Sequence, residues 1–241
     1  MMVHAAKNGQ AGGATATRRP PVVRHYGDGV DRVFEEYGKA GDPDVVLLHG
    51  GFWRADTNRG YLRPMSRQLA AAGTHVYLPE YRRTAGSPMH SLDDVEDFLG
   101  FLAGRGRLVR VMVGHSAGGH LALLHAAAYK TNSPQVVALA PVADLFVHAK
   151  DAANGEADIR SWIGASAQER PALWHRLNPA EHLGRRPSRV TVLHGDADEV
   201  VPLSVTAGIE RTVLPGAGHE DLIDPESRHF RAVLEAVATR L

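Results

Sequence analysis

The chain has 241 residues, carries 27 Lys and Arg against 27 Asp and Glu, and contains no cysteine. The balanced charge, which includes no block of five or six like charges, argues against nucleic acid and anionic membranes as partners and favours small neutral molecules. The lack of cysteine excludes disulfides and thiolate chemistry but leaves the cellular compartment open.

Residues 1–21 lack the apolar core of a secretory signal peptide, and we expect them to form a disordered leader. No segment approaches the roughly 18 apolar residues that a membrane span needs. We therefore expect a soluble, cytoplasmic protein whose residues 22–241 form one domain, because α/β folds of this length commonly bury a single core.

The first expected elements are strands over 22–26 and 32–37, which flank an Asp28-Gly29 turn and suit a hairpin at the edge of a sheet. The apolar run 45–48 predicts a strand covered on both faces. A helix over 60–72, closed by Gly73, then leads to a strand over 75–81. This alternation is typical of a parallel sheet.

The same alternation continues toward the C-terminus. Ser91 resembles a helix-capping residue, and apolar residues recur at helical spacing after it up to Leu102. The remaining expected elements are strand 110–113, helix 119–128, strands 135–142 and 190–193, and a final amphipathic helix over 226–241. Together they predict a mostly parallel, doubly wound α/β sheet with helices on both faces.

The alternation breaks down over residues 143–186, where we expect a small cap segment. Insertions at the carboxyl edge of a sheet can roof a site and exclude water, so this segment is a candidate to shape a substrate pocket. The aromatic residues Phe146, Trp162 and Trp174 equally suit a small core of the cap's own, and the sequence leaves both alternatives open.

A glycine-rich loop follows the first buried strand, with the sequence HGGFW at residues 49–53. Paired glycines allow the backbone to turn its amides inward, as an oxyanion hole requires, although they would also suit a plain tight turn. We nominate the N–H groups of Gly51 and Phe52 as donors, together with that of Ala117. Trp53 lies at the expected mouth of the site and is a candidate for substrate contact.

The strongest motif is GHSAG at residues 114–118, between a predicted strand and a predicted helix. A serine at a sharp strand-to-helix turn is lifted clear of its neighbours, and the flanking glycines let the strand and helix backbones approach closely. This context predicts a nucleophile elbow with Ser116 as the nucleophile.

A serine nucleophile needs a histidine base and an acid that orients the base. Acidic residues follow the strand 190–193, and we favour Asp198 over the alternative Asp196 because it lies further beyond the strand end. His219 lies on a glycine-rich turn 21 positions after Asp198. The chain order Ser116, Asp198, His219 is that of the α/β-hydrolases.

Three further histidines, His115, His120 and His125, recur at intervals of five, which spreads them around a helix rather than on one face. We therefore predict no metal site there. No cofactor is called for, because a triad, oxyanion donors and water complete the reaction.

The motifs at residues 49–53 and 114–122 together resemble those of α/β-hydrolase serine esterases that include kynurenine formamidase, whose loop motif is H-G-G-x-W. The resemblance runs from about Val45 to His219. It implies the α/β-hydrolase fold and the hydrolysis of a small-molecule carboxylic ester or N-formyl aryl amide through an acyl-enzyme. The tryptophan after the glycine pair favours an arylformamidase over lipase-type carboxylesterases.

Several alternatives stay open at this point. Acyl-aminoacyl peptidases share the elbow and the segment at 194–202. A thioesterase or acyltransferase would differ only in the acyl acceptor, and a non-catalytic ligand-binding protein could use the same fold. The sequence leaves the substrate, its acyl chain and the oligomeric state undetermined.

Overall fold

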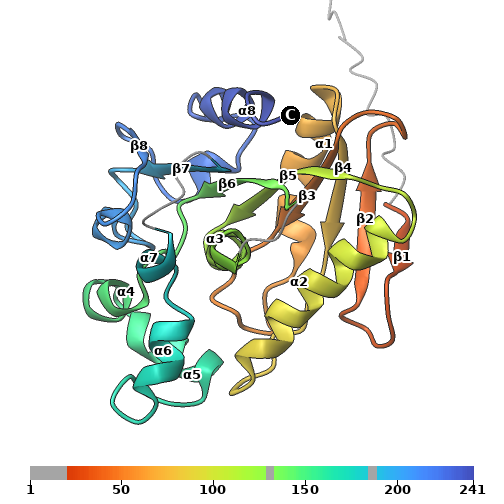
Figure 1. Cartoon of the computed structure of the whole chain (residues 1–241). Coiled ribbons are helices and arrows are strands. Elements are labelled where there is room, and N and C mark those ends of the chain that lie inside the picture. The colour runs from red at the N-terminus through yellow and green to blue at the C-terminus, as the bar shows by residue number, and fades with distance from the viewer. Residues whose placement is uncertain (1–20, 129–132, 184–188) are drawn as a thin grey trace, which may run out of the picture.

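The computed structural model describes residues 21–128, 133–183 and 189–241. Nearly all of the predicted leader, residues 1–20, lies outside these ranges. One eight-stranded sheet runs through the molecule in the order β1-β2-β4-β3-β5-β6-β7-β8 (Figure 1). Its strands are β1 (Val23–His25), β2 (Val33–Tyr37), β3 (Asp44–Leu48), β4 (His75–Pro79), β5 (Val109–His115), β6 (Gln135–Leu139), β7 (Val190–Gly195) and β8 (Thr212–Leu214).

The predicted edge hairpin is confirmed. β1 pairs antiparallel with β2, with Val23 opposite Glu35, and β2 pairs antiparallel with β4. The strands from β4 to β8 are parallel to one another, and the central ones are buried on both faces, as their continuous apolar sequences predict. The sheet is therefore mostly parallel, in agreement with the predicted fold class.

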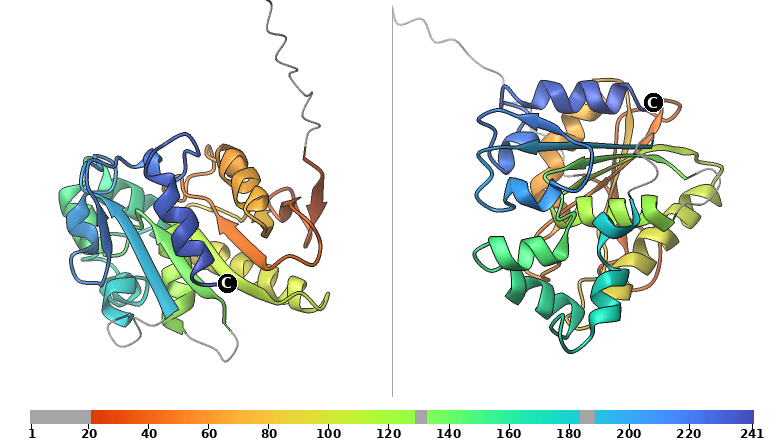
Figure 2. Two further views of the ribbon diagram at one scale, coloured as in Figure 1. Left: turned by 90° about the horizontal axis from the view of Figure 1, so that it is seen from above. Right: turned by 60° about the vertical axis from the view of Figure 1, so that its left-hand side comes forward.

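Helices cover both faces of the sheet (Figures 1 and 2). The 3₁₀ turn η1 (Arg59–Leu62), α1 (Arg63–Ala71) and α8 (Phe230–Ala238) pack on one face. The helices α2 (Pro88–Ala103) and α3 (Ala117–Ala128) pack on the other. No helix within the described ranges is long and apolar enough to span a membrane.

Two predicted helix starts are wrong. α2 begins at Pro88, not after Ser91, because proline suits the first turn of a helix, where an N–H would lack a partner anyway. The buried Ser91 hydroxyl instead donates to the carbonyl of Arg82, at 2.7 Å. α8 begins at Phe230, because turns occupy the preceding residues from Pro225.

The predicted strands over 75–81 and 135–142 are both too long. β4 ends at Pro79, and β6 ends at Leu139. Ala140 then adopts a positive φ of 43°, which turns the chain out of the sheet toward the cap.

The cap lies beyond the carboxyl end of β6 and consists of α4 (Leu145–Asp151), α5 (Gly155–Ile163), α6 (Pro171–Arg176) and α7 (Pro179–His182). The Asp144 side chain caps α4 by accepting from the amides of Phe146 and Val147. Phe146 and Trp174 pack together within the cap, with ring centroids 5.6 Å apart. They form the cap's own core, whereas Trp162 faces the rest of the molecule, as described below.

Candidate active site

A strained serine stands at the end of β5. Ser116 has a φ of 55°, in the left-handed region that residues other than glycine rarely adopt. A Cβ at Gly118 would lie 2.3 Å from the carbonyl oxygen of Leu48, and one at Gly114 would lie 2.3 Å from that of Gly118. These contacts explain the two motif glycines, because α3 crosses the sheet too closely for any larger residue.

The expected acid and base are brought together. His219 Nδ1 lies 2.7 Å from Asp198 Oδ2, and both side chains are almost fully buried. The other Asp198 oxygen accepts from the amides of Val200 and Val201. Burial works to raise the pKa of Asp198, but the hydrogen bonds from His194 and His219 and the His219 charge hold it well below its usual range. Asp198 is thus a carboxylate that orients His219.

The alternative acid, Asp196, has another position. Its side chain is exposed and accepts from the amide of Gly216, at 2.6 Å, which closes the turn before His219. Asp196 therefore shapes the loop and does not contact the base.

The loops that carry Ser116 and His219 are in contact, although the described residues include no hydrogen bond between the two side chains. His115, the residue before the nucleophile, donates from Nε2 to the His219 carbonyl at 3.2 Å, and the two rings lie 4.5 Å apart. The hydrogen bond between a catalytic serine and its histidine base is often long without substrate and shortens in the reacting complex.

Hydrogen bonds between neutral groups connect the loop after β3, the elbow and the loop that carries His219. No sequence motif predicted them. The Gly50 amide donates to Tyr61 Oη at 2.6 Å, and this hydroxyl lies 3.1 Å from His115 Nδ1. Burial holds the pKa of His115 well below its usual value and raises that of Tyr61, so both are neutral. His115 occupies the first variable position of the GxSxG pattern, and this was the available signal for it. Tyr61 belongs to no motif and had no such signal.

The loop after β3 lies against the nucleophile. A Cβ at Gly50 would be 2.8 Å from the Ser116 Cβ. Gly51, Phe52 and Trp53 have φ values of 103°, 52° and 56°, three successive left-handed residues that curl the backbone. No acceptor among the described residues takes the N–H of Gly51 or Phe52. Ala117, the third nominated donor, begins α3, where amides have no partner within the helix.

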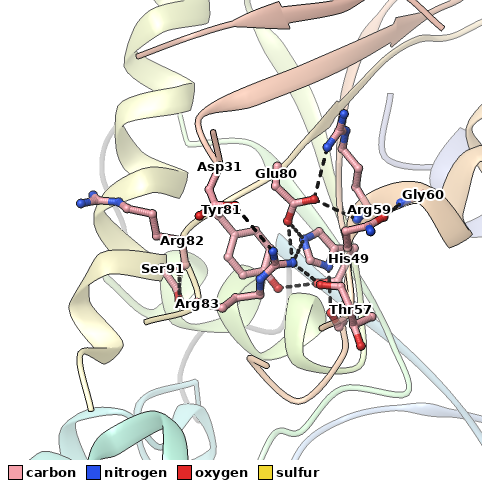
Figure 3. Close-up of polar contacts among 12 residues, drawn as sticks. Asp31, His49, Thr57, Arg59, Gly60, Glu80, Tyr81, Arg82, Arg83 and Ser91 are labelled. Carbon is pink, nitrogen blue, oxygen red and sulfur yellow. Dashed lines mark hydrogen bonds and ion pairs between the residues drawn. The ribbon is translucent and has the colours of Figure 1, made fainter. Parts of the chain in front are cut away.

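Charged and polar side chains just beyond β4, those of Glu80, Tyr81 and Arg83, bind both ends of the loop after β3 and are called the brace (Figure 3). Glu80 binds the His49 ring at 2.7 Å through one oxygen and accepts from the Arg59 amide at 3.1 Å through the other. Burial works to raise the pKa of Glu80, but the His49 hydrogen bond and the charges of His49 and Arg83 lower it to about 2. Glu80 is therefore ionised at any working pH.

The residues after Glu80 complete the brace. Tyr81 donates from its hydroxyl to the His49 carbonyl at 2.7 Å, and the two rings stack with centroids 4.4 Å apart. Arg83 donates to the Thr57 carbonyl and pairs with Glu80 at 2.6 Å. Only His49 among these residues belongs to the HGGFW motif, so no motif indicated the other contacts.

On its other side the loop contacts the cap. Trp53 stacks on Trp162 of α5 with ring centroids 4.5 Å apart, and Arg54 forms an ion pair with Asp158 of the same helix. Trp53 is only 3% exposed, which corrects the expectation that it lies at an open mouth. Its contact with substrate stays a prediction.

Of the three histidines spaced five positions apart, only His120 and His125 lie on one helix, α3, because His115 is the last residue of β5. His120 and His125 bind separate partners, the Leu177 carbonyl and the Glu96 carboxylate. No group of three or more His, Asp or Glu residues in the described part of the chain is placed to hold a metal ion.

A model of the BD-FAE family matches residues 31–212 of this chain. The chain belongs to the BD-FAE family. The BD-FAE match includes the braced loop, the elbow and Asp198, and it ends seven positions before His219.

Similar proteins include a monoacylglycerol lipase of Mycolicibacterium smegmatis, 26% identical, with 83% of this BD-FAE chain and 90% of the lipase covered. A carbohydrate esterase from gut microbiota superposes with a TM-score of 0.71 at 19% identity, covering 91% of this chain and 94% of the esterase. Esterase B of Lactobacillus rhamnosis gives 0.70 at 21% identity, covering 90% and 82%. These structures share the α/β-hydrolase fold, as predicted. The formamidase resemblance still rests on the sequence motifs at 49–53 and 114–122.

Proposed function

We propose that this BD-FAE protein is a serine hydrolase that cleaves carboxylic esters of small molecules through Ser116, His219 and Asp198. One observation carries the proposal: a serine at a φ of 55° stands between β5 and α3, and the residue before it hydrogen-bonds the backbone of His219, which is itself paired with the buried Asp198. Strain at a reactive residue and a paired buried carboxylate together are typical of catalytic sites. The similar proteins named as a lipase and as esterases support an ester substrate.

In the proposed mechanism, His219 takes the proton of Ser116 as Oγ attacks the ester carbonyl, and then protonates the leaving alcohol. The same base activates the water that hydrolyses the acyl-enzyme. Asp198 stabilises the charged His219 without becoming protonated. The developing oxyanion is met by the amides of Gly51, Phe52 and Ala117, since the Gly50 amide already donates to Tyr61.

A second candidate is the hydrolysis of an N-formyl aryl amide. The observation that favours it is Trp53, directly after the nominated oxyanion donors, whose ring is held by Trp162 close to the loop. A fixed indole at this position could stack on an aryl leaving group.

Steady-state hydrolysis of p-nitrophenyl esters of short and longer acids, beside N-formyl-L-kynurenine, tests both candidates. We expect ester turnover, and we expect Ser116→Ala to lower kcat by about 10⁴-fold or more without changing the far-UV circular dichroism spectrum. A fluorophosphonate probe should add to Ser116 alone, as read by peptide mass spectrometry.

The outcomes separate the hypotheses. A formyl amide with kcat/KM well above every ester would move the substrate to arylformamides. Retention of more than a tenth of the activity in Ser116→Ala would contradict the assignment of the nucleophile. Tight ligand binding without turnover would favour the non-catalytic alternative.

A further inference from the structure

Unpartnered polar atoms gather between the proposed oxyanion loop and the cap. Outside arginine, six buried side-chain nitrogens have no hydrogen-bond partner in the part of the chain that the structure describes. Five of the six belong to four residues, namely Trp53, His120, His148 and Trp162. Buried polar atoms in folded proteins are nearly always paired, so this concentration requires an explanation.

His148 is the extreme member of this group. It is 0% exposed, and neither ring nitrogen meets a partner among the described residues. Burial lowers its pKa to about 4, so the ring is neutral at working pH and offers one donor and one acceptor. Leaving such a group unpaired costs stability, which a phenylalanine of similar shape would not.

The position of His148 places it at the site. Its ring stacks on that of Phe52, a nominated oxyanion donor, with centroids 6.1 Å apart. Its helix, α4, is also joined to the loop beyond the catalytic acid, because Ser204 Oγ donates to Asp151 Oδ2 at 2.7 Å. Besides burial, the charges of Asp158, His219 and Asp198 act on the pKa of His148. His148 therefore lies between the proposed oxyanion loop and the acid loop.

Burial of His148 does not separate it from the substrate. Ser116 is only 2% exposed, so a substrate that reaches the nucleophile enters a region closed to solvent in this structure. Phe52, which lies against His148, is only partly buried, and the Arg54 side chain beside it is 47% exposed. These are the side chains that a substrate would displace.

We propose that His148 is a specificity-determining residue that hydrogen-bonds a hydroxyl group of the ester substrate, so that the preferred substrates are esters of a polyol or of a hydroxy acid. The proposal rests on the proposed esterase function. A hydroxyl both donates and accepts, which matches a neutral imidazole, whereas a purely apolar ester would leave both ring nitrogens unpaired. Sites built to bind a hydroxyl reject analogues that lack it.

Matched esters test this. The first pair is 2,3-dihydroxypropyl butanoate against propyl butanoate, with the hydroxyls on the alcohol. The second is propyl 3-hydroxybutanoate against propyl butanoate, with the hydroxyl on the acid. We expect the wild type to favour the hydroxylated ester of one pair by about tenfold or more in kcat/KM, the size of one lost hydrogen bond with its partner left unpaired. The pair that shows the preference identifies the side of the ester that His148 contacts.

The variants are His148→Phe, His148→Gln and His182→Phe. His148→Phe should bring the preference to about one without lowering the melting temperature, because it removes two unpaired polar atoms. His148→Gln keeps a donor and an acceptor and should keep part of the preference. His182→Phe, at an exposed cap histidine, should keep all of it.

Two results would overturn the proposal. The first is that the wild type hydrolyses all these esters with kcat/KM values within a factor of two of one another, while Ser116→Ala is inactive. The other is a His148→Phe variant that loses activity equally on both members of a pair, with a lowered melting temperature, as a structural role through bound water would predict. If instead no ester is hydrolysed faster by the wild type than by Ser116→Ala, the proposed function fails, and this proposal fails with it.

Discussion

At the scale of single residues, two aspartates two positions apart have different partners. Asp198 binds the base through one oxygen and two backbone amides through the other, whereas Asp196 holds a turn at Gly216. Asp198→Asn should lower kcat by about 10³- to 10⁴-fold, because an amide can present its NH₂ group to His219 and favour the wrong tautomer. Asp196→Asn should lower kcat by less than about tenfold, since an amide oxygen still accepts from Gly216.

Parallel kcat measurements of the two variants, with the ester that Ser116 hydrolyses fastest, check this. The reverse ranking would assign the acid to Asp196. Comparable losses in both would mean that the turn at Gly216 positions His219 as strongly as the carboxylate does.

The residues of the proposed triad could be predicted because each carries a local signal. Ser116 has flanking glycines, and Asp198 and His219 each follow an apolar run. The role proposed for His148 could not be predicted, because its helix carries no motif. Whether its ring nitrogens meet a partner depends on which distant segments surround them. A buried, unpaired side chain is a property of packing, to which residues far apart in the chain contribute.

At the scale of elements, the loop after β3 depends on the carboxylate of Glu80, which directly follows the neighbouring strand β4. Glu80→Gln should lower kcat at least about tenfold with little change in KM, because a displaced loop weakens contacts made to the transition state more than those made to the ester. Glu36→Gln is the matched control, since Glu36 pairs with Arg24 at the sheet edge.

Glu80→Gln also leaves the charge of Arg83 without its buried partner, whereas Arg59 keeps its ion pair with Glu35, so the stability of the variant should fall as well. Activity is therefore compared at a temperature where both proteins are folded by circular dichroism. An unchanged kcat under those conditions would mean that the loop keeps its shape without the brace.

The close contact between α3 and β3 can be tested by substitution of a glycine. Gly118→Ala would place a methyl group 2.3 Å from the Leu48 carbonyl and 2.4 Å from that of His49. The strand and helix would have to separate, at a cost of about 3 kcal/mol or more in the free energy of unfolding. Gly100→Ala is the control, because nothing lies within 4 Å of its added Cβ, and this α2 change should stabilise by up to about 1 kcal/mol. Urea unfolding of both variants measures the difference, and equal stabilities would contradict the tight crossing.

At the scale of the whole molecule, buried neutral histidines make stability depend on pH. Burial lowers the pKa values of His120 and His148 to about 4, below the roughly 6.5 of an unfolded chain. Between these values the unfolded state binds more protons, so stability is complete above about pH 6.5 and is lost as the pH falls toward 4. Each group contributes on the order of 3 kcal/mol to this loss.

Urea unfolding at pH 7.5, 6, 5 and 4 measures this loss. His148→Phe should flatten the curve between pH 6.5 and 4 but not abolish the slope, because His148 no longer titrates while the buried His115 and His120 still do. A stability that is constant down to pH 4.5 in the wild type would show that neither histidine stays neutral in the folded protein.

The sheet was the most predictable level of the molecule. Runs such as Val45–Leu48 are apolar throughout because both faces of a central parallel strand are covered, and that pattern is visible without a structure. Helix starts were harder, as α2 shows, because Pro88 and Ser91 are both plausible first residues and only packing decides. The brace around Glu80 depends on strand order, which the sequence does not state.

All the loops of the proposed site leave the carboxyl ends of parallel strands, so the opposite edge of the sheet is free of them. The end of α2 lies at that opposite edge, just before β5, and Ala103 is exposed there. Since the chain has no cysteine, Ala103→Cys would introduce its single thiol. A dye or a solid support attached at that position would leave the proposed catalytic edge accessible, which makes the protein suited to oriented immobilisation.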